Sequence, residues 1–397
     1  MPDSKVNEKP VVLIYAEPLL TPSATFVRSQ GMALRAFTPI FVGTRRLTNG
    51  LTLPNGRVLA MHKCTNRPGP LGTLREVPFK VFGYDPVFFR SAKRFKPVLL
   101  HAHFGPAALT ALPMARWLKV PLVATFHGYD ASVSDEHAKR SPSYTYRNYI
   151  RRRMELERGA SLLIAVSDFI RDEMTRQGFL ASKIVVHYIG VDTDLFRPDP
   201  RVERKRIVLF VGRLAEKKGC EYVIRAMSEV QPGFSDVELI IVGDGPLRTE
   251  LERLAGQTSV RCRFLGYQPP EVIRQWMNRA RVFAAPSVRA HTGDAEGYPI
   301  AFAEAQAMGL PVVSSASGGI LEAVCDGETG FLVPERDTER LAHRLQLLLR
   351  DEALCARMGE AARRRVCAQF NLRRQTAKLE ELYSQVLERY AAQPPQK

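Results

Sequence analysis

The sequence predicts an α/β protein made of two doubly wound parallel-sheet domains that face each other across a cleft. Short apolar runs alternate with helical stretches along the 397 residues, and this alternation breaks near residue 190 and restarts at residue 207. Apolar runs without regular polar alternation are typical of parallel strands that helices cover on both faces. A chain of this length can also supply two complete hydrophobic cores.

The first sheet is expected to begin with the apolar run at residues 11–15, followed by a helix at about 25–36 and a short strand at 39–43. Residues 45–80 are rich in Pro, Gly and Arg, and they predict loops around one short strand. Further strands of this sheet are expected at 98–102, 122–126 and 162–166.

The second sheet is expected to begin at residues 207–211, after the basic run 201–206. Residues 189–200 have turn composition and predict a hinge between the two sheets. After Phe370 a helical pattern runs almost to the end of the chain, and residues 391–397 are expected to fray. The other strands of this sheet are expected at 238–242, 260–265, 282–285, 311–314 and 330–333.

These elements predict an N-terminal domain at 1–197, a C-terminal domain at 198–372, and a helix and tail at 373–397 that can pack back on the N-terminal domain. The composition, 45% hydrophobic and 25% charged, is typical of globular proteins. No run approaches the roughly 20 apolar residues of a membrane span. Residues 1–10 have no apolar core of a signal peptide, so we expect a cytoplasmic protein.

The cysteine and histidine patterns argue against a metal site. The six cysteines are scattered singly without a C-x-x-C pair, which fits reduced thiols. His101 and His103 lie in a strand-like run without acidic or thiol neighbours, which favours a packed or polar-rim role over metal binding. We therefore expect neither a metal nor another cofactor.

The net charge of +16 is concentrated in the first half of the chain. Residues 1–195 carry 27 Lys/Arg against 15 Asp/Glu, whereas the rest carries 30 against 26. Arginines, tyrosines and one lysine interleave within residues 139–158. This cluster suits an anionic membrane surface, a solvated helix face or, third, nucleic acid, for which no accompanying motif is present. We therefore expect a membrane surface as a partner and no nucleic acid.

Residues 296–304 place two carboxylates, Glu296 and Glu304, eight positions apart, the first in a turn and the second in a helix that Pro299 can start. This offset is roughly 12 Å, about the span from the sugar ring to the ribose of a nucleotide sugar. The free N–H groups of the first helical turn attract anions such as a diphosphate. The alternative is a solvated turn and a polar helix face. Because the helix is apolar nearly all round, however, Glu304 needs a partner.

Cationic and glycine residues follow several strands of the second sheet, where open α/β sheets bind ligands. Arg213 and Lys218 follow the strand at 207–211, and together they favour phosphate binding over two separate surface ion pairs. We assign Gly266-Tyr267 to a nucleotide base and Gly318-Gly319 to the phosphate cradle, because glycine lets a ligand approach the backbone. A plain turn is the alternative for both.

One histidine of the first half also follows a strand. His127 comes directly after the expected strand at 122–126, so it should face the cleft from the other side. A lone histidine at a strand end is more often structural than catalytic, and only the neighbouring motifs favour a catalytic role here.

These residues resemble the retaining nucleotide-sugar glycosyltransferases of family 4, which have the GT-B fold of two Rossmann-like domains. The resemblance covers nearly the whole chain. It rests on Phe126-His127-Gly128-Tyr129-Asp130, on Ile189-Gly190-Val191-Asp192 with Phe196, on Val211-Gly212-Arg213-Leu214 with Lys218-Gly219, and on residues 296–304 followed by Gly309-Leu310-Pro311-Val312-Val313.

The resemblance implies a metal-independent displacement on one face of the sugar, in which the departing phosphate takes the acceptor proton. Cationic side chains and helix N-termini would neutralise the diphosphate. By this resemblance, Arg213 and Lys218 hold the diphosphate, Glu304 bonds the ribose hydroxyls, Glu296 contacts the sugar with Gly297 and Ile300 beside it, and His127 and Glu296 are the catalytic residues.

The chain departs from many family members after its first strand. They carry a Gly-Gly loop there, whereas this chain has a Pro-rich segment at residues 17–26, similar to the branch devoted to bacterial exopolysaccharide and lipopolysaccharide assembly. We therefore predict a hexosyltransferase that uses a nucleotide diphosphate sugar and a lipid-linked saccharide acceptor at the inner membrane face. The alternative is a non-catalytic protein that binds nucleotide sugars or nucleic acid, because doubly wound folds host many functions.

Overall fold

The computed structural model describes residues 9–22, 24–48, 50–64 and 70–392. The expectations for residues 1–8 and for 393–397 of the frayed end therefore lie outside the described residues. Residues 391–392, also expected to fray, are helical. The chain divides into two compact units, and each is described by itself. Unit 1 comprises residues 1–166, 170–190 and 372–397, and unit 2 comprises residues 167–169 and 191–371.

Unit 1 contains a seven-stranded sheet in the order β3-β2-β1-β4-β5-β6-β7, and all neighbouring strands are parallel. The order reverses beside β1 (Val11–Tyr15), as in a doubly wound sheet. The other strands are β2 (Thr38–Leu47), β3 (Val58–Cys64), β4 (Pro97–His103), β5 (Leu122–Phe126), β6 (Leu162–Ala165) and β7 (Ile184–Val186).

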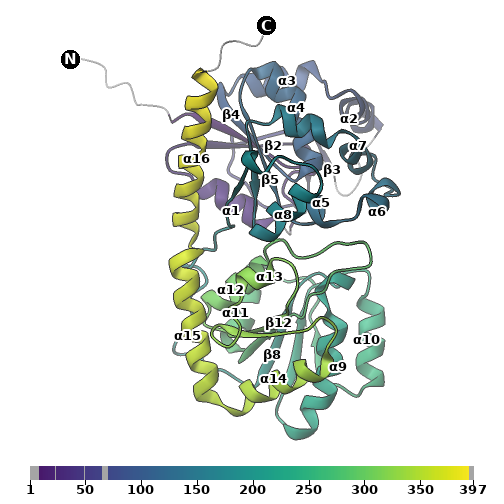
Figure 1. Cartoon of the computed structure of the whole chain (residues 1–397), viewed down its shortest axis with the longest axis vertical. Coiled ribbons are helices and arrows are strands. Elements are labelled where there is room, and N and C mark those ends of the chain that lie inside the picture. The colour runs from purple at the N-terminus through teal and green to yellow at the C-terminus, as the bar shows by residue number, and fades with distance from the viewer. Residues whose placement is uncertain (1–8, 23, 49, 65–69, 393–397) are drawn as a thin grey trace, which may run out of the picture. The chain divides into compact units, whose positions relative to one another are not determined.

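The described helices of unit 1 cover this sheet (Figure 1). The last of them, α16 (Leu372–Ala392), runs along unit 1 and buries Leu379 and Tyr383 in the same apolar cluster as Val12 and Phe37. The others are α1 (Thr25–Ala33), α2 (Pro70–Phe82), α3 (Pro86–Lys93), α4 (Gly105–Leu118), α5 (Tyr129–Ser132), α6 (Asp135–Lys139), α7 (Tyr144–Gly159) and α8 (Asp168–Arg176).

The prediction of loops at residues 45–80 is wrong for two parts of that segment. Strand β2 continues to Leu47, and the segment ends in helix α2, which contains Pro78. Glycine and proline lower the intrinsic tendency to form a helix, so composition hides this element. Tertiary contacts compensate, because the helix buries Phe79 and Glu76.

Unit 2 contains a six-stranded parallel sheet in the order β10-β9-β8-β11-β12-β13. The predicted strands at 207–211, 238–242 and 330–333 are confirmed at those bounds, and the others shift by one or two residues at an end. The strands are β8 (Ile207–Val211), β9 (Glu238–Val242), β10 (Cys262–Phe264), β11 (Val282–Ala284), β12 (Val312–Ser315) and β13 (Gly330–Val333).

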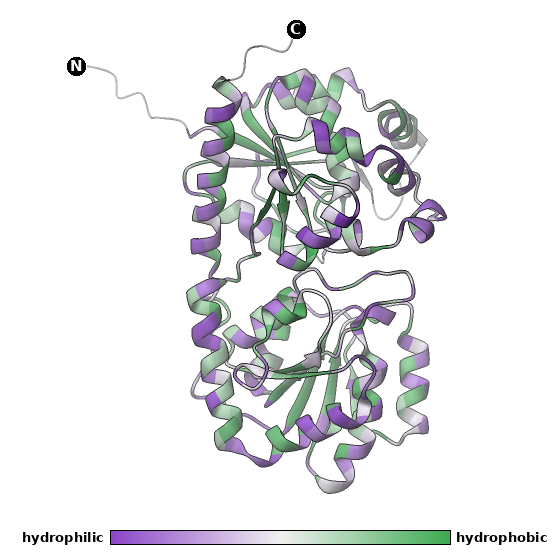
Figure 2. Ribbon diagram, viewed as in Figure 1, coloured by the Kyte–Doolittle hydropathy of each residue, from purple (hydrophilic) through white to green (hydrophobic). Residues whose placement is uncertain are grey.

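Helices again cover the second sheet, and Figure 2 shows the strands of both sheets coloured mainly as hydrophobic. The predicted α/β class with two doubly wound parallel sheets is therefore confirmed. None of the described helices is long and apolar enough to cross a membrane. The helices of unit 2 are α9 (Cys220–Val230), α10 (Arg248–Gln257), α11 (Pro270–Arg279), α12 (Ile300–Ala307), α13 (Ile320–Ala323), α14 (Thr338–Arg350) and α15 (Glu352–Gln369).

Candidate active site

The loop after β8 carries two of the predicted phosphate-binding cations. Arg213 is exposed, and its side chain has no hydrogen bond or ion pair to the part of the chain that the structure describes. Lys218 ends the short 3-10 helix η2 (Glu216–Lys218), and its Nζ lies 2.6 Å from Oε1 of Glu296. The structure thus brings Lys218 and Glu296 together, although sequence reasoning assigned them to different parts of a donor.

Glu296 is a buried, ionised carboxylate in unit 2, with only 6% of its surface exposed. Burial alone would raise the pKa of Glu296, but the charges of Lys218 and Lys217 and hydrogen bonds from Lys218 and Ser287 lower this pKa below its usual value. The Ser287 hydroxyl donates to Glu296 Oε1 at 3.4 Å. Glu296 is therefore held in one place as an anion.

The two other residues of η2 fix the same loop in place. Lys217 Nζ lies 3.0 Å from Oδ1 of Asp294, and Glu216 accepts a 2.9 Å hydrogen bond from the backbone N–H of His291. Three consecutive residues of η2 thus pair with residues 291, 294 and 296. Sequence reasoning missed Lys217, Asp294 and His291. The charged run at 216–218 was the only feature of the sequence that could have indicated these ion pairs, and a solvent-exposed turn has the same composition.

Gly318 and Gly319 pack directly against the backbone of Glu296 and Gly297. The N–H of Gly319 donates to the carbonyl of Glu296 at 2.8 Å, and a Cβ on Gly319 would lie 1.7 Å from the Gly297 oxygen. Gly318 has a φ of 53°, which side chains rarely adopt. Glycine is therefore required at both positions, and the two segments form one continuous backbone wall.

Glu304 lies on α12, which begins directly after Pro299. Its carboxyl group is half-buried and has no hydrogen bond or ion pair to any residue that the structure describes. Burial raises the pKa of Glu304 to about 8. The sequence indicated that this carboxyl group needs a partner, and the protein itself supplies none. Ile300, in the first turn of α12, is also half-buried.

The predicted base-binding pair lies at the neighbouring strand ends. Gly243, after β9, donates its N–H to the carbonyl of Gly266 at 2.8 Å. A Cβ on Gly243 would lie 1.9 Å from the Gly212 oxygen, so the loops after β8, β9 and β10 are in close contact. Tyr267 is 60% exposed, and its ring presents a flat surface on which a base can stack.

His127 lies in unit 1, directly after β5, whereas Lys218, Glu296 and Glu304 lie in unit 2. Its Nε2 is 3.0 Å from Nδ1 of His103, while Phe26 and Phe104 contact its ring. Burial and the neighbouring His103 hold the pKa of His127 well below its usual value, and burial lowers the pKa of His103 to about 3. Both rings are therefore neutral at pH 7, and one donates the hydrogen bond that the other accepts.

The loop that holds His127 is organised by Asp130. Its carboxylate accepts hydrogen bonds from the backbone N–H groups of Gly105, His127 and Gly128 at 2.9, 3.0 and 2.9 Å. Nδ1 of His127 is buried without a hydrogen-bond partner among the described residues. His127 thus has a fixed backbone and one buried ring nitrogen that has no hydrogen-bond partner among the described residues.

A metal site would need a cluster of suitable ligands. Across residues 9–22, 24–48, 50–64 and 70–392, no group of three or more His, Cys, Asp or Glu side chains is placed to hold an ion. His101 is instead hydrogen-bonded to Thr125 Oγ1 at 2.7 Å and to Tyr383 Oη at 2.5 Å. Arg213, Lys217 and Lys218 are the cationic residues of the loop after β8.

Comparison with known proteins identifies the family. The model for "Glycosyl transferases group 1" matches residues 192–365, and the model for "Glycosyltransferase Family 4" matches residues 41–195. The amylovoran biosynthesis glycosyltransferase AmsK of Erwinia amylovora is 32% identical over 289 residues, which cover 70% of this chain and 68% of AmsK. The chain belongs to glycosyltransferase family 4.

Another relative and a solved structure agree with this assignment. A GDP-mannose-dependent alpha-(1-6)-phosphatidylinositol monomannoside mannosyltransferase of Mycolicibacterium smegmatis is 34% identical over 71% of this chain and 75% of its own length. The crystal structure of Anabaena HepE in complex with UDP and glucose matches with a TM-score of 0.74 and 22% identity, over 95% of this chain and 100% of that chain. At this identity the likeness establishes the fold, and the predicted GT-B fold is confirmed.

Proposed function

We propose that this glycosyltransferase transfers a hexose, with retention of anomeric configuration and without a metal, from a nucleotide diphosphate sugar to a lipid-linked saccharide. The observation that carries this proposal is the half-buried Glu304 carboxyl group without a partner, on the same sheet edge as the Lys218–Glu296 pair. Such a group remains costly until a ligand with hydroxyl groups contacts it. The ribose of a nucleotide has two such hydroxyls.

The positions of the residues in unit 2 support the following donor-binding roles. Arg213 and Lys218 bind the diphosphate, while the bare backbone at Gly318 and Gly319 allows it to come close. Glu304 bonds the ribose, and Gly266 and Tyr267 receive the base. Glu296 bonds the sugar hydroxyls, with Gly297 and Ile300 beside the sugar.

The Lys218–Glu296 ion pair supports a coupled binding step. When Lys218 turns toward a diphosphate, Glu296 loses its cation and becomes free to accept hydrogen bonds from the sugar. The charge of the diphosphate then replaces the carboxylate as the partner of Lys218. Binding of the phosphate and of the sugar would thus reinforce each other within one site.

In the transfer step, the bond from the anomeric carbon to the phosphate oxygen breaks as the bond to the acceptor oxygen forms on the same face. The acceptor hydroxyl proton passes to the departing phosphate oxygen. Arg213 and Lys218 stabilise the charge that develops on the diphosphate. His127, neutral at pH 7, orients the reacting sugar through its available Nδ1.

The proposed acceptor and the proposed location of the enzyme are inferred from the names of its relatives. AmsK carries the name of amylovoran biosynthesis, and the mycobacterial relative acts on a phosphatidylinositol mannoside. We therefore propose a saccharide acceptor on a lipid carrier in exopolysaccharide or lipopolysaccharide assembly. The enzyme would act at the inner face of the cell membrane, bound peripherally to anionic lipid.

The test is nucleotide release from a panel of UDP-, GDP- and TDP-hexoses, with and without EDTA. We expect release from one donor class, unchanged by EDTA, and retention of configuration in the product by NMR. Lys218→Ala and Glu304→Ala should abolish donor binding, whereas the exposed control Lys205→Ala should not. Donor binding without any turnover would favour a non-catalytic binding protein, and an absolute need for a divalent metal would overturn metal independence.

A further inference from the structure

Helix α2 of unit 1 exposes several large apolar side chains and buries a charged one. Leu74 is 70% exposed, Val77 52% and Phe82 77%, and Arg75 is exposed beside them. Its buried face carries Glu76, of which 4% is exposed, together with Phe79. Surface helices normally bury the apolar side and expose the charged one.

Buried ion pairs hold α2 in this orientation. The Glu76 carboxylate lies 3.1 Å from Nε of Arg45 on β2 and 3.2 Å from Nε2 of His62 on β3, and it also pairs with Lys80. Lys80 in turn lies 2.7 Å from Glu17. Rolling the helix inward would leave these charges buried without partners, which is more costly than exposing apolar side chains. The outward apolar face is therefore built into the fold.

The apolar surface continues beyond α2 into α3. We define the apolar ridge as the exposed side chains within residues 74–87. Six of the fifteen large apolar side chains exposed in the described chain belong to it, a concentration that marks an interaction surface. The members of the ridge are Leu74, Val77, Val81, Phe82, Tyr84 and Val87.

The exposed charged side chains that follow the ridge in the sequence are of one sign. The two acids of this segment, Glu76 and Asp85, are buried, and Asp85 is paired with Arg75 at 2.9 Å. The exposed charges that follow the ridge are all cationic, and this arrangement complements a surface dense in negative charge. These cations are Arg90, Lys93, Arg94 and Lys96.

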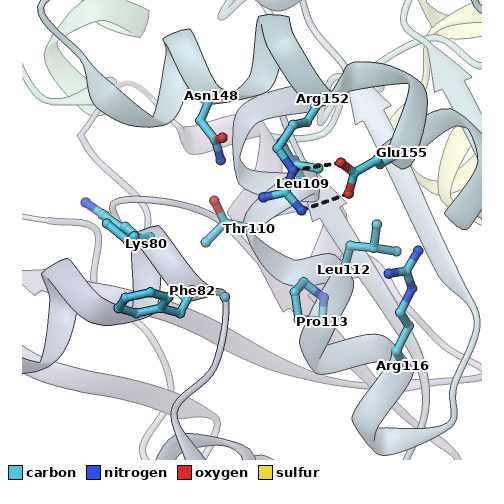
Figure 3. A pocket seen from close by; sticks show the side chains of 12 residues that line it. Lys80, Phe82, Leu109, Thr110, Leu112, Pro113, Arg116, Asn148, Arg152 and Glu155 are labelled. Atoms are coloured by element: carbon cyan, nitrogen blue, oxygen red, sulfur yellow. Dashed lines mark hydrogen bonds and ion pairs between the residues drawn. The ribbon is translucent and has the colours of Figure 1, made fainter.

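A hollow between α2, α4 and α7 adjoins the ridge and shares Phe82 with it (Figure 3). Thr110 and Asn148 supply polar groups to this hollow. Arg152 is bonded to Glu155 at 2.9 and 2.8 Å, whereas the exposed Arg116 side chain has no hydrogen bond or ion pair among the described residues. The hollow can therefore hold a small anionic group beside an apolar surface.

We propose that the apolar ridge docks unit 1 on an anionic lipid bilayer. The ridge side chains enter the interfacial region, the cations after it contact lipid phosphates, and the hollow receives one headgroup. This proposal rests on the proposed function, because it specifies which surface meets the membrane that carries the acceptor.

The basic run at residues 139–158, favoured by the sequence, is the weaker candidate. Several of its arginines are paired with acids: Arg140 with Glu136, Arg152 with Glu155, and Arg153 with Asp135. Its charge is therefore partly neutralised. It can add long-range attraction, but it has no apolar surface comparable with the ridge.

Vesicle flotation of the full chain tests the ridge. The wild type should bind vesicles of phosphatidylcholine and phosphatidylglycerol at low salt and lose most binding with phosphatidylcholine alone. Val77→Ser with Phe82→Ser should weaken binding about tenfold, because two interfacial apolar side chains are lost. Leu180→Ser is the matched control, since Leu180 is 57% exposed in unit 1 but lies outside the ridge.

A second set of variants in the same flotation assay removes the cations that follow the ridge. Arg90→Gln with Arg94→Gln and Lys96→Gln should weaken binding about tenfold at low salt and much less at high salt. The control removes the same charge from exposed arginines of unit 2. Its positions are Arg225, Arg253 and Arg357. Equal loss in both sets would show that net charge alone binds the vesicle and would overturn the ridge.

Fluorescence quenching locates the contact directly. Tryptophan placed by Phe82→Trp should be quenched severalfold more by brominated lipid than tryptophan placed by Leu180→Trp, with the signal of Trp117 and Trp276 subtracted. No quenching at position 82 in floated protein would overturn the proposal. So would concentration-dependent dimerisation that Phe82→Ser abolishes, because the ridge would then cover a second copy of this chain.

Different results would contradict the proposed function and the proposed membrane-docking surface. Nucleotide release from a donor sugar needs no membrane, so the ridge variants should retain the rate of the wild type in solution. If vesicles bind through the ridge but no sugar nucleotide is turned over, the proposed function fails and the docking surface stands. If turnover is normal but no vesicle is bound, only the docking surface fails.

Discussion

Helices α2 and α12 each place a glutamate away from solvent, and the two carboxyl groups have opposite surroundings. Glu76 on α2 is paired with Arg45, His62 and Lys80. Glu304 on α12 has no partner among the described residues, and burial raises its pKa to about 8. A buried carboxylate with cationic partners helps to hold its helix in place, whereas a carboxyl group without a partner and with a raised pKa is a candidate contact for a ligand.

The first consequence is a difference in stability. Glu76→Ala should lower the free energy of unfolding by about 3 kcal/mol, because it leaves the Arg45 and Lys80 side chains without their buried anion. Glu304→Ala should have a much smaller effect or stabilise the protein, because it removes a half-buried carboxyl group that has no partner among the described residues. Urea unfolding of both variants measures the difference. If Glu304→Ala destabilises the protein more than Glu76→Ala, the contrast drawn between the two carboxyl groups is wrong.

The second consequence concerns donor binding. At pH 9, above the pKa of about 8 of Glu304, Glu304→Gln should weaken the binding of the nucleotide part of the donor by about 2 kcal/mol, roughly thirtyfold, because in the proposed site a charged hydrogen bond to the ribose becomes neutral. Isothermal titration with the free nucleoside diphosphate measures this loss. Glu250→Gln, an exposed change in unit 2, is the matched control. Unchanged affinity in Glu304→Gln would remove Glu304 from the site.

The features of the fold and of the candidate site that could be predicted from the sequence are those that depend on residues close together in the chain. Strand bounds such as 207–211 follow from apolar runs, and Glu296, Glu304 and Lys218 follow from their spacing and position after strands. The pairing of Glu76 with Arg45 depends on side chains from separate strands, so no local pattern shows it. The same holds for the outward apolar face of α2, because its charged partners are distant in sequence.

The partners of η2 were missed for the same reason. Lys217 and Asp294 are 77 positions apart, and their contact forms only when the loop after β11 folds back. Conversely, the composition of residues 45–80 misled the prediction, since proline and glycine in α2 are outweighed by burial of Phe79. Local signals located the candidate site, while the tertiary ion pairs that shape it needed the structure.

The third consequence is a pH dependence. The folded-state pKa of Glu304 is about 8, above the ordinary value of 4.5, so the folded state binds the proton more tightly than the unfolded chain. Its stabilising contribution is therefore complete below about pH 4.5 and is lost as the pH rises through about 8. Between pH 5 and pH 8 the wild type should lose about 1–2 kcal/mol relative to Glu304→Gln, allowing for partial exposure.

Unfolding curves of the two proteins at several pH values measure this difference. The histidines with lowered pKa titrate in both proteins, so their effect cancels. A constant difference between wild type and Glu304→Gln across this pH range would show that Glu304 is ionised throughout. That result would also remove the reason for expecting it to need a ligand.

The smallest effect is expected where a charge is already satisfied and partly exposed. Lys217 pairs with Asp294 at 3.0 Å, and about a quarter of each side chain is exposed. Lys217→Gln should therefore change the free energy of unfolding by less than about 1 kcal/mol and donor affinity by less than about threefold. Lys218→Gln should reduce donor affinity far more, because in the proposed binding step Lys218 leaves Glu296 and binds the diphosphate. Equal losses in the two variants would mean that η2 attracts the donor through its summed charge, and Lys218 would lose its individual role.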